Sequence, residues 1–202
     1  MELTHLIAFN LTLLAALASP GPAMLLAIRA TLSGGRAQGL ATGLGLGTMA
    51  AIWTLTALLG LDVIFTLFPW AYLAMKLIGA AYLLWIAWGM WRNAAAPIDT
   101  QGTSAPRRHA FRTGLLVNLA NPKSVFFAAS VLVVIFPPDM TLANKALIVA
   151  NHLAVEWIAY SVFALALSTK PARDGYLRLK PILDRLAAAV LGMLGLRLLT
   201  DR

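Results

Sequence analysis

The chain has no cysteine and few charged residues. Of its 202 residues, 12% are charged and 60% are hydrophobic, whereas soluble domains have about 25% and about 45–50% respectively. The absence of cysteine excludes disulfide bonds, thiolate metal sites and thiol nucleophiles. A soluble core of this size needs a charged surface around it, and these charges are too few to form one. The composition therefore excludes a disordered chain and argues strongly against an ordinary soluble domain.

Basic residues outnumber acidic ones, and the formal net charge is +8. They are scattered between apolar blocks and form no continuous basic tract. Proteins that bind nucleic acid usually gather such residues into a patch or stripe. We therefore expect no nucleic-acid partner.

Six apolar blocks are long enough to cross a bilayer, which takes about 20 mostly apolar residues. This predicts an all-α membrane protein. The first block is expected to be a retained span and not a cleaved signal, because the N-terminus has no basic flank. The predicted spans are Leu3–Ile28, Ala37–Leu61, Trp70–Trp91, Phe111–Phe136, Ala146–Leu167 and Ile182–Leu199.

The Lys and Arg residues alternate between the connections that join the six spans. The odd-numbered connections hold ten and the even-numbered ones hold one, Lys145. The positive-inside rule places the odd connections in the cytoplasm, and both termini then face outward. A five-span alternative, with Ile182–Leu199 lying on the membrane surface, leaves the C-terminus inside.

The chain is predicted to consist of two halves of three spans each. Residues 1–92 form the first half, 93–110 a cytoplasmic linker with two prolines, and 111–202 the second half. Three is an odd number, so the second half enters the membrane with the opposite orientation. A weak internal repeat supports this division, since LASPGPAM from Leu17 corresponds to LANPKSVF from Leu119. Matching interrupted helices in two inverted halves are typical of transporters.

Prolines are expected to break the first and fourth spans. Pro20 and Pro22 flank Gly21 in the first, and Pro122 lies in the fourth. A proline inside a helix lacks an N–H and clashes with the carbonyl four residues earlier. Carbonyls freed in this way must face protein, water or a solute. One break alone would indicate a packing kink, whereas two at corresponding positions favour a pathway for a solute.

Charged residues within the predicted spans are candidates for function. Glu156 lies near the middle of the fifth span, where a carboxylate is costly unless it is paired, protonated or solvated. It could carry a proton, or it could be a structural partner of Lys76 or Lys123. Lys123 could bind a substrate carboxylate or extend to the cytoplasmic interface. His152 could relay protons or have a purely structural role.

Glycines in the second span, Gly39, Gly43 and Gly47, recur at four-residue spacing. This pattern predicts a face of small residues along which another helix packs closely.

Several short segments, in this order, carry a family resemblance. They are SPGP at Ser19–Pro22, SGGR at Ser33–Arg36, KLIGAAYLLW at Lys76–Trp85, FRTG at Phe111–Gly114 and NLANPK at Asn118–Lys123. With them, the chain resembles the LysE/RhtB family of bacterial amino-acid exporters. The resemblance implies a secondary exporter of amino acids in the bacterial cytoplasmic membrane. It further implies proton coupling, alternating access, six spans and assembly into a homo-oligomer, with no cofactor.

The resemblance also suggests site residues. The two broken-helix segments and the second span supply the substrate-binding candidates Ser19, Pro20, Gly21, Pro22, Thr48, Asn118, Asn121, Pro122 and Lys123. Many family members carry an aspartate where this chain has Thr48. Its loss argues against a dibasic substrate and favours neutral amino acids such as threonine, homoserine or branched-chain residues. Glu156 could then supply the proton site.

Other functions fit the sequence less well. An intramembrane hydrolase needs a nucleophile with a base or a set of metal ligands, and the chain has only three histidines. A metal exporter needs several ligands within the membrane, and we expect no metal site. Two alternatives remain: an exporter of another small metabolite, and a structural membrane subunit that transports nothing.

Overall fold

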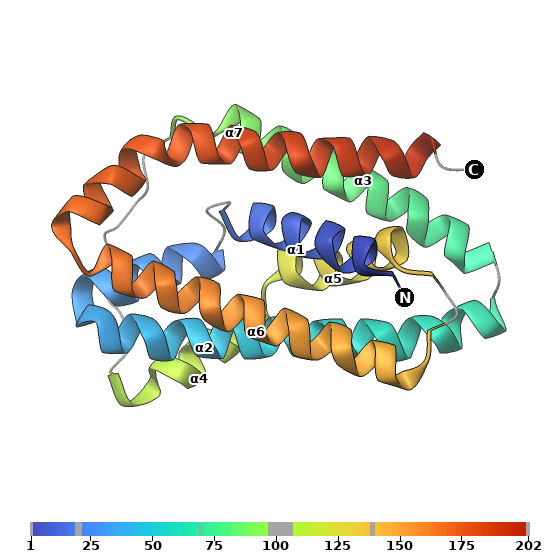
Figure 1. The fold of residues 1–202 in the computed structure, drawn as a ribbon, viewed down its shortest axis with the longest axis horizontal. Helices are drawn as coiled ribbons and strands as arrows, with labels where there is room; N and C mark the ends of the chain where they lie inside the picture. Colours follow the sequence, from blue (N-terminus) through green and yellow to red (C-terminus); the bar gives the residue numbers. More distant parts are fainter. Residues whose placement is uncertain (1, 19–21, 69, 97–106, 138–139, 201–202) are drawn as a thin grey trace.

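The described part of the chain is entirely helical. The computed structural model describes residues 2–18, 22–68, 70–96, 107–137 and 140–200. Within these ranges there are no strands, and Figure 1 shows most helices running along the long axis of the molecule. The α-helices are α1 (Leu3–Ala18), α2 (Pro22–Leu67), α3 (Trp70–Arg92), α4 (Ala110–Leu119), α5 (Pro122–Ile135), α6 (Leu142–Leu167) and α7 (Lys170–Thr200), with a 3-10 turn, η1, at Arg107–His109.

The long helix α2 consists of two helical segments. Gly35 between them has φ 74° and ψ 179°, a conformation that residues with a side chain rarely adopt. The first segment, residues 22–34, continues the predicted first span, and the second contains the predicted second span. The chain thus turns at the SGGR segment, where the sequence predicts its first cytoplasmic connection.

The helices differ from the predicted spans at two places. The predicted fourth span is divided into α4 and α5, whose axes differ by 62°. The last helix starts at Lys170, whereas the sequence predicts a connection up to Lys180. By length and composition, α2 over Ala23–Gly60 and α6 can each cross a membrane, and the bent pair of α4 and α5 adds a third candidate. The six spans and the inverted repeat therefore stay predictions.

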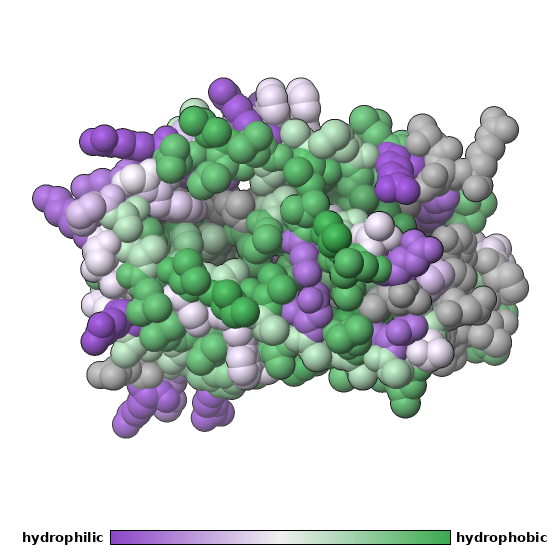
Figure 2. Space-filling model, viewed as in Figure 1, coloured by the Kyte–Doolittle hydropathy of each residue, from purple (hydrophilic) through white to green (hydrophobic). Residues whose placement is uncertain are grey.

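The outer surface is hydrophobic, as lipid contact requires. The side chains of Trp85, Ile158 and Val162 are all more than half exposed. Figure 2 shows hydrophobic residues over most of the middle of one face, with hydrophilic residues gathered mainly toward its ends. The largest buried cluster of the described residues lies between α1, α2, α3, α5, α6 and α7, and its most deeply buried members include Phe9, Leu83, Val131, Ile148 and Leu191.

The predicted glycine face of α2 packs against α6. An added Cβ at Gly43 would lie 2.5 Å from Cβ of Tyr160, and one at Gly47 would lie 2.8 Å from Cβ of Glu156. An added Cβ at Gly39 would lie 3.2 Å from Cβ of Ala164. The prediction of close packing is confirmed, and it fixes the distance of Glu156 from α2.

We predict that Gly43→Ala destabilises the protein. Alanine favours a helix over glycine by about 1 kcal/mol, but the added methyl group overlaps Tyr160. Overpacking of this kind costs about 1–3 kcal/mol. Thermal unfolding of the protein in detergent measures the effect. Gly89→Ala is the control, because apart from the backbone of its own helix no described atom lies within 4 Å of its added Cβ. Equal melting temperatures for the two variants would contradict the prediction.

Candidate functional site

The break between α4 and α5 is stabilised by an asparagine cap. Asn121 has an extended backbone, and its side-chain Oδ1 accepts a hydrogen bond from the backbone N–H of Lys123 at 3.1 Å. Pro122 follows at the first turn of α5. Proline disfavours a helical conformation in the residue before it and suits the first helical position. The Asn-Pro pair thus ends one helix and begins the next.

A second break separates α1 from α2. Helix α1 ends at Ala18 and α2 begins at Pro22. The candidates Ser19, Pro20 and Gly21 lie outside the described residues. Just before this break, the backbone oxygen of Ala16 accepts a hydrogen bond from Nζ of Lys123 at 3.0 Å. The last carbonyls of a helix lack partners within the helix and carry partial negative charge, so a lysine suits this position. Lys123 therefore joins the two breaks.

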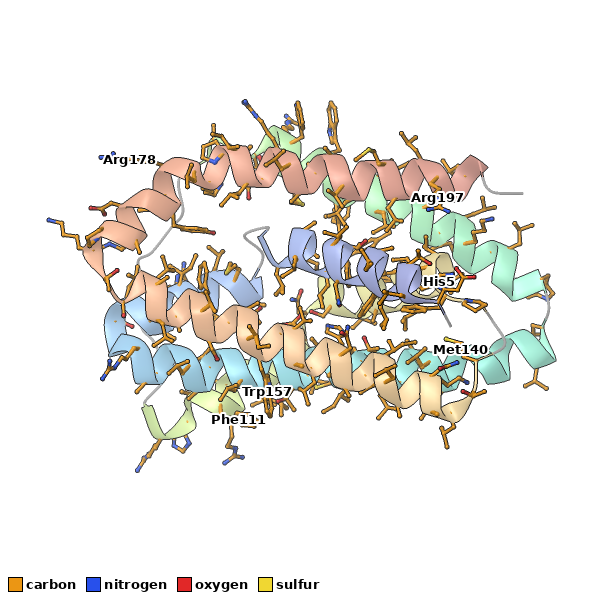
Figure 3. The ribbon with its side chains drawn as sticks, in the orientation of Figure 1. His5, Phe111, Met140, Trp157, Arg178 and Arg197 are labelled. Carbon is orange, nitrogen blue, oxygen red and sulfur yellow. The ribbon has the colours of Figure 1, made fainter. Side chains whose placement is uncertain are left out.

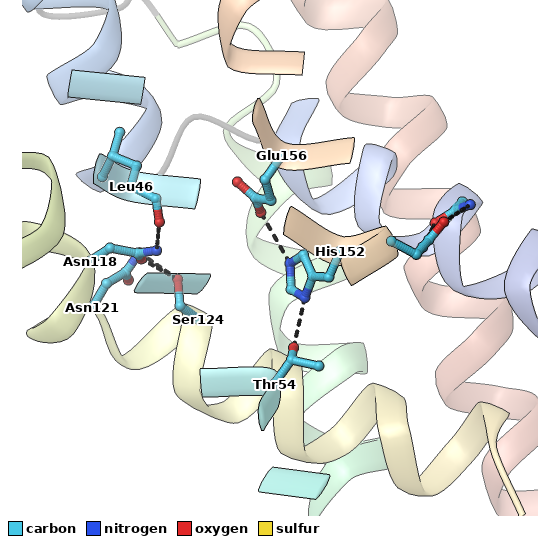
Figure 4. A network of polar contacts seen from close by, with 9 residues as sticks. Leu46, Thr54, Asn118, Asn121, Ser124, His152 and Glu156 are labelled. Atoms are coloured by element: carbon cyan, nitrogen blue, oxygen red, sulfur yellow. Dashed lines mark hydrogen bonds and ion pairs between the residues drawn. The ribbon is translucent and has the colours of Figure 1, made fainter. Parts of the chain in front are cut away.

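Asn118 is the centre of a buried polar network around the α4–α5 break (Figure 4). Its Nδ2 donates to the carbonyl of Leu46 on α2 at 2.6 Å. Its Oδ1 accepts hydrogen bonds from Nδ2 of Asn121, at 3.3 Å, and from the hydroxyl of Ser124. The indole N–H of Trp53 donates to the Asn118 carbonyl at 3.3 Å. These bonds satisfy the polar groups that the break exposes and hold it against α2.

A second buried set of polar side chains connects α6 to α2. His152 and Glu156 are one helical turn apart on α6, and Nε2 of His152 lies 3.4 Å from Oε1 of Glu156. The other ring nitrogen, Nδ1, lies 2.7 Å from the hydroxyl of Thr54. All three residues are at most 5% exposed. The ring of Phe9 on α1 packs edge-on against His152, with centroids 5.4 Å apart. The imidazole and the carboxylate are therefore neighbours in a part of the protein that is shielded from bulk water.

The network around Asn118 and the pair His152 and Glu156 border the same cavity, which we call the central cavity. Its volume is about 50 Å³, enough for water or for part of a small solute. It brings together a buried carboxylate, an amine and two amides from different helices. The lining residues are Leu13, Ala16 and Leu17 from α1; Ala23, Met24 and Ala50 from α2; Asn118 from α4; Asn121, which caps α5; Lys123, Ser124 and Phe127 from α5; and His152, Glu156 and Tyr160 from α6.

Only some of the site residues predicted from the sequence border this cavity. Asn118, Asn121, Lys123 and Glu156 border it, whereas Thr48 does not. The Thr48 hydroxyl donates to the carbonyl of Leu44 and accepts from the indole of Trp157 at 3.2 Å. Figure 3 shows Trp157 on the side of α6 nearest α2 and α4. In this structure, Thr48 therefore contributes to the contact between α2 and α6.

Pro22 and Pro122 contribute through the backbone. They begin α2 and α5, directly after the two breaks.

Sequence reasoning missed two features of this region. Tyr160 borders the cavity one turn beyond Glu156, and the series 152, 156, 160 on one helix face could have revealed it. The other is a buried ion pair on α7, in which Nζ of Lys180 lies 2.8 Å from Oδ2 of Asp184 and also donates to the carbonyl of Ala94 at 2.9 Å. Its four-residue spacing is the available signal.

Comparison with known proteins found one family model and several relatives that match most of the chain. The model of the family "LysE type translocator" matches residues 14–202. The chain is 31% identical over 196 residues to the threonine efflux protein of Salmonella typhi, covering 93% of both chains. It is 29% identical to the uncharacterized membrane protein YahN of Escherichia coli, covering 91% of this chain and 83% of the relative. It is 28% identical to the homoserine/homoserine lactone efflux protein of Salmonella typhimurium, covering 72% of each. No solved structure matches the chain significantly.

These findings confirm the predicted membrane location. The relatives are membrane and efflux proteins by name, and α2 and α6 are long and apolar enough to cross a bilayer.

We predict that Lys180→Met strongly destabilises the protein. It leaves the carboxylate of Asp184, a residue that is 1% exposed, without the lysine that it pairs with. Removing one member of a buried ion pair typically costs about 3–5 kcal/mol. Thermal unfolding in detergent measures the loss, with the exposed Lys170→Met as control.

The double variant Lys180→Met, Asp184→Leu tests the cause. It removes both charges and should recover most of the stability. A double variant no more stable than Lys180→Met alone would contradict this explanation.

Proposed function

Because the chain belongs to the LysE type translocator family, we propose that it is a secondary exporter of neutral amino acids in the bacterial cytoplasmic membrane. Efflux proteins for threonine and for homoserine among its relatives support an amino-acid substrate. Translocators and efflux proteins are transporters, which argues against an enzyme. Six spans in two inverted halves, as the apolar blocks and the weak internal repeat predict, and assembly into a homo-oligomer, as the family resemblance implies, are part of the proposal.

The observation that carries the proposal is the central cavity with its opposite charges. Lys123 enters it from α5 and Glu156 from α6. An amino acid carries one carboxylate and one ammonium group. We propose that Lys123 binds the carboxylate and Glu156 the ammonium group, with Asn121 and the end of α1 completing the site. Charge-assisted hydrogen bonds of this kind are about twice as strong as neutral ones.

The two helix breaks provide the movement that transport requires. Lys123 holds the end of α1 through the carbonyl of Ala16. A substrate carboxylate that attracts Lys123 would compete with this bond and loosen α1 from α5. We propose that this competition couples substrate binding to alternating access, with the breaks as hinges.

Glu156 and His152 are the proposed site of proton coupling. The ionisable groups that face Glu156 are His152 and Tyr160 on α6 and Lys123 on α5; Thr54 from α2 and Phe9 from α1 complete the surroundings of His152. A proton on the Glu156 carboxylate removes its attraction for the substrate ammonium. Binding of a proton from outside would therefore release the substrate there, and loss of that proton inside would restore the site.

Export from cells tests the proposed substrate class. Bacteria that overproduce the protein, loaded with dipeptides that cover all amino acids, should release a small group of neutral amino acids faster than cells with an empty vector. Lys123→Gln should reduce this release about tenfold or more, because it removes a charge-assisted bond of about 1.5–3 kcal/mol. Mass spectrometry of the medium measures the release.

The control for this experiment is Lys170→Gln, an exposed lysine on α7, at equal membrane abundance. If the folded wild-type protein releases no amino acid, the amino-acid proposal is wrong, and the alternatives are another exported metabolite and a structural subunit.

Glu156→Gln should abolish the dependence of transport on a proton gradient. The amide cannot take up a proton, but it keeps the size of the side chain. In proteoliposomes, an inward proton gradient should accelerate export by the wild-type protein. Export by the variant should stay at the rate measured without a gradient. Glu2→Gln, an exposed carboxylate, is the matched control. Undiminished acceleration in Glu156→Gln would refute the coupling role.

A further inference from the structure

A second cavity, which we call the apolar chamber, adjoins the central cavity. Its volume is about 260 Å³, against about 50 Å³ for the central cavity. The two share three wall residues, Leu17, Met24 and Tyr160. In Figure 2 this face is hollowed between α7 and the end of α1, over the elements that line the chamber. The complete described lining is Leu14, Leu17, Met24, Ala159, Tyr160, Phe163, Tyr176 and Leu183.

The walls of the chamber offer hydrocarbon and aromatic surface to an occupant. None of the described lining residues carries a full charge. Phe163 and Tyr176 stack edge to face with centroids 5.2 Å apart. The Tyr176 hydroxyl is buried and has no hydrogen-bond partner among the described residues, and the rest of the wall beside it is mostly apolar. A charged group would lose its hydration here without a charged side chain to pair with, which is unfavourable. The chamber therefore suits an apolar group.

We propose that the apolar chamber receives the side chain of the transported amino acid. The substrates of this chain are then amino acids with large apolar side chains, such as leucine, isoleucine, methionine and phenylalanine, in preference to threonine or homoserine. This inference rests on the proposed function, since it assumes that Lys123 and Glu156 bind the charged groups.

The shared wall carries the argument. Because Leu17, Met24 and Tyr160 border both cavities, a substrate bound in the central cavity has the chamber on the other side of these three side chains, and the proposal places its side chain there. Burial of a leucine side chain there favours binding by roughly tenfold to a hundredfold over alanine, which does not reach it. A threonine side chain has less apolar surface to bury in the same place, so threonine gains less. A lipid acyl chain also matches apolar walls, but it makes no use of the charged cavity next to them.

The test is to fill the chamber with a larger side chain at one of its lining positions, Ala159. Ala159→Phe adds a ring inside it, and Ala159→Val is a smaller step that guards against misfolding. Ala154→Phe is the matched control, because Ala154 is an exposed alanine on the same helix and does not line the chamber. Purified protein in liposomes is assayed with labelled leucine, threonine and alanine at one pH. Binding is measured in parallel as the rise in melting temperature that each amino acid causes.

We expect the wild-type protein to prefer leucine to alanine and threonine by about tenfold. Ala159→Phe should reduce leucine transport about tenfold and change alanine transport less than twofold, with Ala159→Val between, and Ala154→Phe should change neither. Equal loss for leucine and alanine, or no change in either, would overturn the inference. So would phospholipid that copurifies with the wild type and is lost in Ala159→Phe without an effect on transport.

The melting temperatures separate this inference from the proposed function. If leucine but not alanine stabilises the wild type, and Ala159→Phe removes the effect, the chamber binds the side chain even where no transport is observed. If threonine is transported best and is insensitive to Ala159→Phe, the exporter proposal holds and the chamber inference is wrong.

Discussion

The structure around the central cavity depends on one constraint, which is that a helix broken inside an apolar layer must satisfy its freed backbone groups. Here the solutions are specific. Asn121 caps the start of α5 through the N–H of Lys123, and the same lysine binds the carbonyl of Ala16 near the end of α1 through its side chain. Asn118 fastens the end of α4 to the carbonyl of Leu46. Three helix ends and α2 are thereby held together, and the polar groups needed for the repair are the ones that border the cavity.

The glycine face of α2 brings the second charge into the same place. Close contact at Gly43 and Gly47 draws α6 toward α2, so that the hydroxyl of Thr54 can reach His152. His152 in turn lies beside Glu156. A buried carboxylate without such neighbours would be very costly. Packing by small residues, which needs no chemistry of its own, thus positions the groups to which we assign proton coupling.

Local features of this arrangement were readable in the sequence, and long-range ones were not. The prolines predicted the breaks at Pro22 and Pro122, and the turn at Gly35 lies in the connection predicted between the first two spans. The four-residue spacing of His152 and Glu156 was available as a signal, but the partners considered for Glu156 were Lys76 and Lys123. Contacts between distant residues, such as Thr54 with His152 or Lys123 with Ala16, depend on how helices cross, which periodicity does not determine. The early start of α7 was missed because its basic residues resemble a connection; Lys180 is in fact buried against Asp184. The six spans, the inverted repeat and the roles of the site residues stay predictions.

In the proposed mode of binding, the two adjoining cavities recognise different parts of the amino acid. Opposite charges in the central cavity suit the ammonium and carboxylate groups that every amino acid carries, so they select the class of substrate and not its member. The apolar chamber contacts whatever lies beyond those groups, and none of its described lining residues takes part in the hydrogen bonds around Asn118. Substitutions in the chamber can therefore change which amino acid is preferred without disturbing the helix breaks. On this argument, relatives with similar breaks can differ in substrate through a few apolar side chains.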